Sequence, residues 1–254
     1  MKYFVHQDSI VREIWGKADT VLFIFAGASA EFALNKAVDW LYFTGRLPAD
    51  PLGRLFSTVA YARRIVFSEL EEANSAIDTM AHIHAAVEAK RGTAIPDWAY
   101  RDVLFMLIDY SIRSFEVLER KLTVAEQAEV FQVFGRVGNR MGLKGLPTSL
   151  QEWQLMRQEH LAQNMQESWH TRDLYQQYRK HLGWVRYRLL LEAQALVAPE
   201  QVRRLLGLRP FSLLTPVLQV YKFSRALRLA WLLKAIVLPT TYKTEIKALD
   251  QVSS

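Results

Sequence analysis

The chain has 254 residues, half of them apolar, so it can bury a sizeable core without disulfides or a structural metal. Cysteine is absent, which excludes a disulfide framework, thiolate-ligated zinc or iron–sulfur sites and a cysteine nucleophile. The net charge is +6 and the pI about 9.5, but the basic residues become more frequent in the last third and form no dedicated stripe. We therefore expect no nucleic-acid partner.

Apolar residues at helical spacing predict a first long helix over residues 11–39, with Gly27 as a candidate weak point. A loop follows over residues 45–53, because two prolines and two glycines cannot share one helix. Asp50 followed by Pro51 is typical of a helix start, with a capping carboxylate before proline at the first helical position. The helices expected here cover residues 51–66, 69–90 (ended by Gly92) and 98–118.

The second half continues the helical pattern. Thr123 and Glu126 have the spacing of a capping box, and the helix that they begin should end before the loop at Gly142. Thr148 or Ser149 should cap the helix after that loop. The remaining helices are expected over residues 150–168, 172–195, 199–206 and 215–237.

No strand-like alternation of useful length interrupts this series, and no Ser/Gly linker is visible. A weak subdivision near Ala198 and Pro199 stays open. The sequence therefore predicts an all-α fold, a single-domain bundle of about eight or more helices spanning residues 1–254. Bundles of this kind build cofactor pockets between facing helices, and we expect such a pocket here.

Residues 1–12 have neither the apolar core nor the small-residue cleavage site of a signal peptide. The most apolar run, residues 20–30, is shorter than the roughly 20 residues of a membrane span. We therefore expect a soluble, cytoplasmic chain. Residues 213–237 mix Arg and Lys with large apolar residues, which leaves open a peripheral membrane contact, although a packed helix with solvated charges is the commoner explanation.

Most enzyme signatures are missing. The sequence has no dinucleotide-binding fingerprint, Walker loop, nucleophile elbow or HExxH motif. Glu159 and His160 are adjacent instead of three residues apart, so the di-iron carboxylate pattern also fails. Catalysis by a protein nucleophile alone has little support.

One constellation does suggest chemistry. Arg54 and Thr58 are four residues apart, so they share a helix face, and His84 lies on the next predicted helix. An antiparallel return of that helix would bring a cation, a hydroxyl and an imidazole to a common space. Imidazole ligates haem iron, and an arginine can pair with a haem propionate or polarise dioxygen. His82 should point to solvent, because two residues correspond to roughly 200° around a helix.

At these residues the chain resembles the rubber oxygenases (latex clearing proteins) and MpaB-type oxygenases of the DUF2236 group. Their shared pattern is D-P-x-x-R-L-x-x-T, then I-H-x-x-V and a glycine, with a G-x-x-x-x-L-P loop further on. The set is only moderately specific, and its strength lies in the order of its parts. The matching residues here are Asp50, Pro51, Arg54, Leu55, Thr58, Ile83, His84, Val87 and Gly92, and the segment 141–147 resembles the later loop.

The resemblance implies a haem b-dependent oxygenase that uses dioxygen on a hydrophobic, isoprenoid or lipid-like substrate. By position, His84 would be the metal ligand, and Arg54 and Thr58 would be cofactor-binding and catalytic residues close to the haem. One departure is Ser57, where rubber oxygenases have a lysine that can occupy the other haem face. No catalytic glutamate aligns either; Glu31 and Asp39 are the nearest upstream carboxylates.

These departures keep a second interpretation open, a non-catalytic helical protein that binds haem or lipid on the same scaffold. The individual residues also have ordinary structural explanations. Arg54 could bond a neighbouring helix C-terminus, and Thr58 could bond the carbonyl four residues back. The aromatic residues of the first helix could form ordinary core instead of a pocket wall.

Overall fold

The structure is a computed structural model that describes residues 2–45 and 49–219. The described residues form helices joined by loops, with two isolated β-bridges and no β-strand, so the all-α prediction is confirmed for these residues. The described helices are α1 (Ile10–Gly16), α2 (Ala18–Leu34), α3 (Val38–Phe43), α5 (Pro51–Phe67), α6 (Leu70–Arg91), α7 (Asp97–Leu118), α8 (Val124–Arg140), α9 (Leu150–Gln163), α10 (Trp169–Val197) and α11 (Glu200–Leu205).

The prediction of one helix over residues 11–39 is wrong, because the structure divides this segment into α1, α2 and α3. Lys17 separates the first two helices with extended backbone angles (φ −101°, ψ 115°). Asn35 ends α2 in the same way, and its side chain then accepts a hydrogen bond of 2.8 Å from the Ala37 amide. At Asn35 this local side-chain bond competes with helix continuation, and no glycine or proline marks the break.

Gly27 is not a weak point in α2. A Cβ atom built at this position would lie 2.2 Å from the ring of Tyr110 on α7, so the missing side chain lets the two helices approach closely. The functional value of this glycine is therefore in packing, and the cost of glycine within a helix is outweighed by the close contact.

The capping predictions are confirmed. Asp50 accepts a bond from the Gly53 amide with Pro51 at the first helical position, and Thr123 forms a full capping box with Glu126. Ser149, and not Thr148, caps α9. Gly92 ends α6 in the left-handed region at φ 75°, where glycine carries no steric penalty.

In the second half, α9 ends five residues before the expected end at 168, and α10 extends beyond the expected 172–195 at both ends. Gly183 interrupts α10 with φ 72° and ψ 171°, so the long helix is kinked there. Residues 214–219 are helical, and the rest of the helix expected over 215–237 lies outside the described residues. In the described chain no helix is long and apolar enough to cross a membrane.

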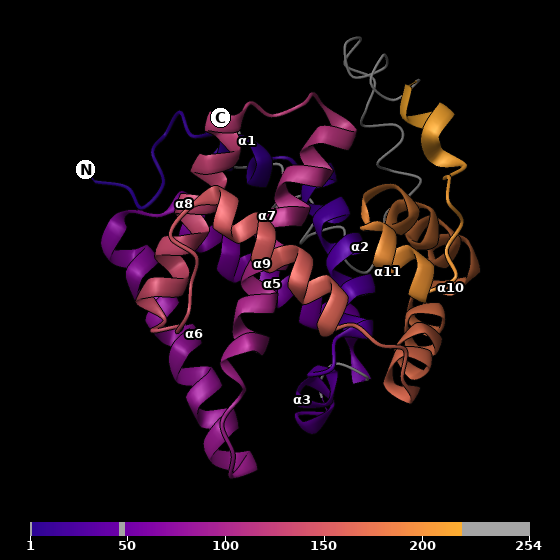
Figure 1. Cartoon of the computed structure of the whole chain (residues 1–254), viewed down its shortest axis with the longest axis horizontal. Coiled ribbons are helices and arrows are strands. Elements are labelled where there is room, and N and C mark those ends of the chain that lie inside the picture. The colour runs from indigo at the N-terminus through magenta and orange to yellow at the C-terminus, as the bar shows by residue number, and fades with distance from the viewer. Residues whose placement is uncertain (1, 46–48, 220–254) are drawn as a thin grey trace.

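Helix α2 is the centre of the arrangement, since it packs on α7 along one side and on α10 along another. Figure 1 shows α10 on one flank and α6 with α8 on the opposite flank, with α6 and α7 diverging from the turn that joins them. The core beneath α1 contains Trp15, which is fully buried against Phe25 and Phe134 and donates to Ser111 Oγ at 3.2 Å. This packing leaves an apolar cavity between α2, α5, α6, α7 and α10.

Candidate functional site

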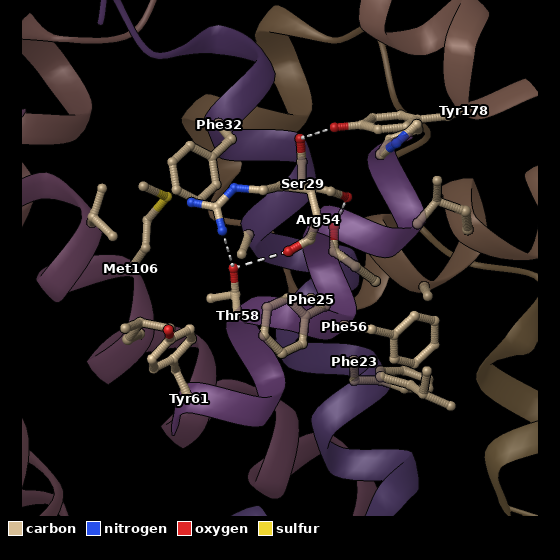
Figure 2. Close-up of a pocket in the computed structure, with 18 of the residues that line it drawn as sticks. Phe23, Phe25, Ser29, Phe32, Arg54, Phe56, Thr58, Tyr61, Met106 and Tyr178 are labelled. Atoms are coloured by element: carbon tan, nitrogen blue, oxygen red, sulfur yellow. Dashed lines mark hydrogen bonds between the residues drawn. The ribbon is translucent and has the colours of Figure 1, made fainter. Parts of the chain in front are cut away.

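The cavity has a volume of about 580 Å³, within the range of roughly 300–1,000 Å³ that is usual for small-molecule and cofactor sites. Its walls are mainly aliphatic and aromatic, and Figure 2 shows Phe23, Phe25, Phe32 and Met106 among them. The polar or ionisable side chains in the described lining are Asp19, Ser29, Arg54, Thr58, Tyr61, His84, Tyr100, Tyr178 and Arg186. All three residues singled out in the sequence therefore line one cavity.

Arg54 and Thr58 lie on one face of α5, as their spacing predicts. The guanidinium of Arg54 donates to Thr58 Oγ1 at 3.4 Å, and the Thr58 hydroxyl donates to the Arg54 carbonyl at 3.1 Å (Figure 2). Ser57 makes the same pair of contacts, at 3.3 and 2.8 Å. The bond from Thr58 to the carbonyl four residues back is thus present, and the same hydroxyl also steadies the guanidinium.

His84 enters the cavity from α6 and is half-buried. Its ring meets the ring of Tyr100 edge-on, with centroids 5.4 Å apart, and the Tyr100 hydroxyl donates to Glu88 at 3.1 Å. The Nδ1 of His84 is buried, and the backbone of Met80, four residues earlier on α6, lies close enough to the ring to act on its pKa. His82 is exposed, as predicted, and its Nδ1 lies 2.7 Å from the Asp78 carbonyl.

The pKa of His84 is lowered, first by burial and also by the positive charge of Arg54. The Met80 backbone and Glu88 act in the opposite direction without cancelling this shift. His84 is therefore neutral at physiological pH, and neutral imidazole is the form that ligates a metal.

These features are compatible with a haem. The neutral imidazole of His84 on the cavity wall could ligate haem iron, an arginine could pair with a propionate, and apolar walls suit a porphyrin. No group of three or more metal-ligating side chains exists among the described residues. An iron held by a porphyrin needs none, because the ring itself supplies most of the ligands.

The two upstream carboxylates are both engaged elsewhere. Asp39 pairs with Arg91 at 2.5 Å, and Glu31 is fully buried in a network outside the cavity. The acidic residue in the described cavity lining is Asp19, at the start of α2. Nothing in the sequence around Asp19 predicts that it lines the cavity.

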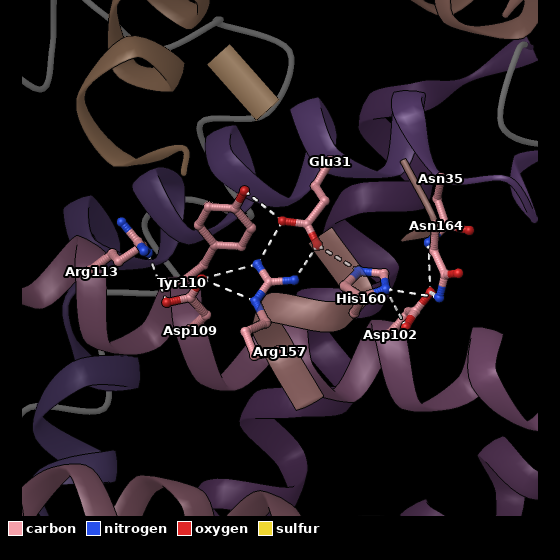
Figure 3. A network of polar contacts seen from close by, with 9 residues as sticks. All are labelled: Glu31, Asn35, Asp102, Asp109, Tyr110, Arg113, Arg157, His160 and Asn164. Atoms are coloured by element: carbon pink, nitrogen blue, oxygen red, sulfur yellow. Dashed lines mark hydrogen bonds and ion pairs between the residues drawn. The ribbon is translucent and has the colours of Figure 1, made fainter. Parts of the chain in front are cut away.

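The network around Glu31 joins α2, α7 and α9 (Figure 3). Both carboxylate oxygens of Glu31 accept bonds from the guanidinium of Arg157, which also donates to Asp109 at 3.0 and 3.1 Å. Tyr110 donates its hydroxyl to Glu31 at 2.9 Å. All of these charged groups are buried, so the cluster is a polar core within the bundle.

His160 extends this network towards α7. Its Nε2 lies 3.1 Å from Glu31, and its Nδ1 forms an ion pair with Asp102, to which Asn35 and Asn164 donate at 3.2 and 3.0 Å. Burial by itself lowers the pKa of His160, but the contacts with Asp102 and Glu31 raise it overall. Sequence spacing held a weak signal for this cluster, since Asp102 and Asp109 are seven residues apart on one face of α7.

We expect the network to make stability pH-dependent. Burial raises the pKa of Glu31, but Arg157 and His160 outweigh it and bring the pKa from 4.5 to about 2. The stabilisation that ionised Glu31 gives the folded state is therefore complete at pH values above its unfolded-state pKa. It is lost as the pH falls from about 4.5 towards about 2. Glu31→Gln should lower the thermal midpoint at pH 7 and flatten its decline between pH 5 and pH 2. Unfolding curves as steep in the variant as in the wild type would contradict this assignment.

Fold and site together define an all-α protein with an apolar cavity that presents an imidazole, a guanidinium and a hydroxyl. Comparison of the sequence with protein families then identifies the group. Residues 14–232 match the family model described as ER-bound oxygenase mpaB/B′/rubber oxygenase, catalytic domain, and the chain belongs to this family. The match includes Arg54, Thr58 and His84. No curated protein and no solved structure matches the chain.

Proposed function

We propose that this protein is a haem b-dependent oxygenase that uses dioxygen on a hydrophobic, isoprenoid or lipid-like substrate. The observation that carries the proposal is the convergence of His84, Arg54 and Thr58 on one apolar cavity. Membership of an oxygenase family supports the reaction class. The nature of the cavity wall supports the substrate class, because an apolar enclosure selects apolar ligands.

Each of the three residues has a role that its surroundings favour. His84 would hold the haem iron through its neutral imidazole, with the ring oriented by Tyr100. Arg54 would pair with a propionate or stabilise negative charge that develops during the reaction, and Thr58 would keep the guanidinium in place. When bound, haem supplies the one-electron and dioxygen chemistry that protein side chains cannot provide.

The walls contribute by keeping water out. Phe25, Phe32 and Met106 present apolar surface to the cavity, which lowers the local dielectric constant and strengthens the field of the Arg54 charge. A hydrophobic substrate would gain binding energy from the same surface.

The second candidate is a protein that binds haem or lipid on this scaffold without catalysis. The observations that favour it are Ser57 in place of the family's lysine and the scarcity of carboxylates in the described lining, where Asp19 is the one acid. The two candidates differ in whether oxygen is consumed.

The test measures oxygen uptake by haem-loaded protein with a lipophilic polyene, a sterol precursor or a fatty acid. We expect at least one of these to stimulate uptake. Arg54→Ala should lower the rate by about a hundredfold, as for other groups that stabilise developing charge, and should change haem content far less. Arg64→Ala is the matched control on the same helix, because Arg64 is exposed and pairs with Glu72. If the protein binds haem but none of these compounds stimulates oxygen uptake, the oxygenase proposal is wrong and the non-catalytic candidate stands.

A further inference from the structure

Arg186 lines the same cavity from α10 and was not singled out by the sequence. Its side chain is half-buried, together with the cavity-lining Leu182, Leu189 and Leu190 of the same helix. The Nε of Arg186 is buried and makes no hydrogen bond. Among the described residues no carboxylate forms an ion pair with it. The cavity thus contains a cation whose buried Nε donor has no partner among residues 2–45 and 49–219.

Both acids of α10 are bonded to other groups. The acids of α10 are Asp173, which accepts from Tyr42 at 2.8 Å, and Glu192, which accepts from Ser212 and the Leu213 amide at 3.0 and 2.7 Å. Tyr178, the nearest polar residue of α10 in the lining, donates to the Ser29 carbonyl at 3.4 Å (Figure 2). None of these groups bonds Arg186, and its buried Nε stays without an acceptor in the described part of the chain.

An arginine in this position is stabilised when an anion binds to it. A guanidinium does not lose its proton in proteins, so burial cannot neutralise it as it could a lysine. A buried donor without an acceptor is unfavourable, and a planar carboxylate satisfies the guanidinium fork with two parallel bonds. The described lining has two arginines, Arg54 and Arg186, against the single acid Asp19, which favours a ligand with negative charge.

We propose that Arg186 is a carboxylate-binding residue of the cavity. Two kinds of molecule carry a carboxylate on a large apolar body that this cavity would accept. One is a long-chain acid, which would be the substrate or product class of the oxygenase; this alternative rests on the proposed function. The other is haem itself, through a propionate. Either molecule would bind with its carboxylate against α10 and its apolar body against the walls formed by α2, α5 and α7.

The first arm of the test measures binding of oleate and of oleyl alcohol, which differ in the head group alone, to the full-length protein by equilibrium dialysis. If the carboxylate belongs to a long-chain acid, the wild type should bind oleate at least about tenfold more tightly than the alcohol. Arg186→Gln should remove this preference, Arg186→Lys should restore part of it, and Arg188→Gln, an exposed position on the same helix, should leave it unchanged. The measurement needs neither haem nor turnover, so it remains informative if the oxygenase proposal fails.

The second arm measures the rate at which haem-loaded protein loses haem to an excess of apomyoglobin. If the carboxylate is a propionate, Arg186→Gln should accelerate the loss about tenfold or more, and the dimethyl ester of haem should leave both proteins at a similar rate. Circular dichroism of each variant verifies that it is folded. The proposal is overturned if Arg186→Gln is folded and alters neither the oleate preference nor the haem-loss rate, which would mean that the guanidinium is satisfied by water at the cavity mouth.

Discussion

Replacement of His84 by alanine should abolish haem binding. Among the described residues that line the cavity His84 is the one histidine, and its lowered pKa keeps the imidazole in the metal-ligating form. Arg54 and Thr58 offer the iron no comparable ligand, because a guanidinium has no free electron pair and a hydroxyl binds ferric haem weakly. Wild-type protein purified after expression with a haem supply should show a Soret band, and His84→Ala should lose nearly all of it.

The matched control is His82→Ala, two positions earlier on α6, where the side chain is exposed. It should retain the haem content of the wild type. His84→Ala should remain folded, since the side chain is only half-buried and forms no ion pair with any described residue. A wild-type protein that is colourless and takes up no added haemin would refute the cofactor proposal, whatever the variants do.

The second large effect is expected at Arg157, and it concerns stability. Arg157→Met would leave Glu31, which is fully inaccessible to solvent, without its main counter-charge. Asp109 would keep its ion pair with Arg113 at 2.7 Å. Loss of one partner from a buried ion pair typically costs about 3–5 kcal/mol, because an uncompensated charge stays behind in a low-dielectric environment. Urea unfolding should therefore give a free energy of unfolding lower than that of the wild type by about this amount.

Two further variants test whether the destabilisation of Arg157→Met comes from the loss of its ion pairs. Arg172→Met removes an exposed arginine that pairs with Glu167 and should leave the unfolding midpoint nearly unchanged. The double variant Glu31→Gln/Arg157→Met should recover part of the loss, since it removes the stranded carboxylate as well. If Arg157→Met alone were as stable as the wild type, the pairing of α9 with α2 and α7 through this residue would be wrong.

The sequence by itself determined the helical class and most helix ends. Asp50 with Pro51, Thr123 with Glu126, and Gly92 are local signals that act within one turn, so they can be identified without knowledge of the neighbouring helices. The spacing of Arg54 and Thr58 likewise fixed their common face, because four residues are close to one helical turn. The family was also identified from an ordered set of residues that a sequence displays directly.

Only the tertiary structure decided which distant residues meet. The tight contact of Gly27 with Tyr110 depends on how α2 and α7 pack. The pairing of Glu31 with Arg157 joins residues 126 positions apart, and no periodicity within one helix can reveal it. Arg186 looks like any basic residue of a polar helix, and packing alone turns it towards the cavity. The physical reason is the same in each case: local signals determine a helix, whereas burial, charge pairing and cavities arise from the surfaces of several helices at once.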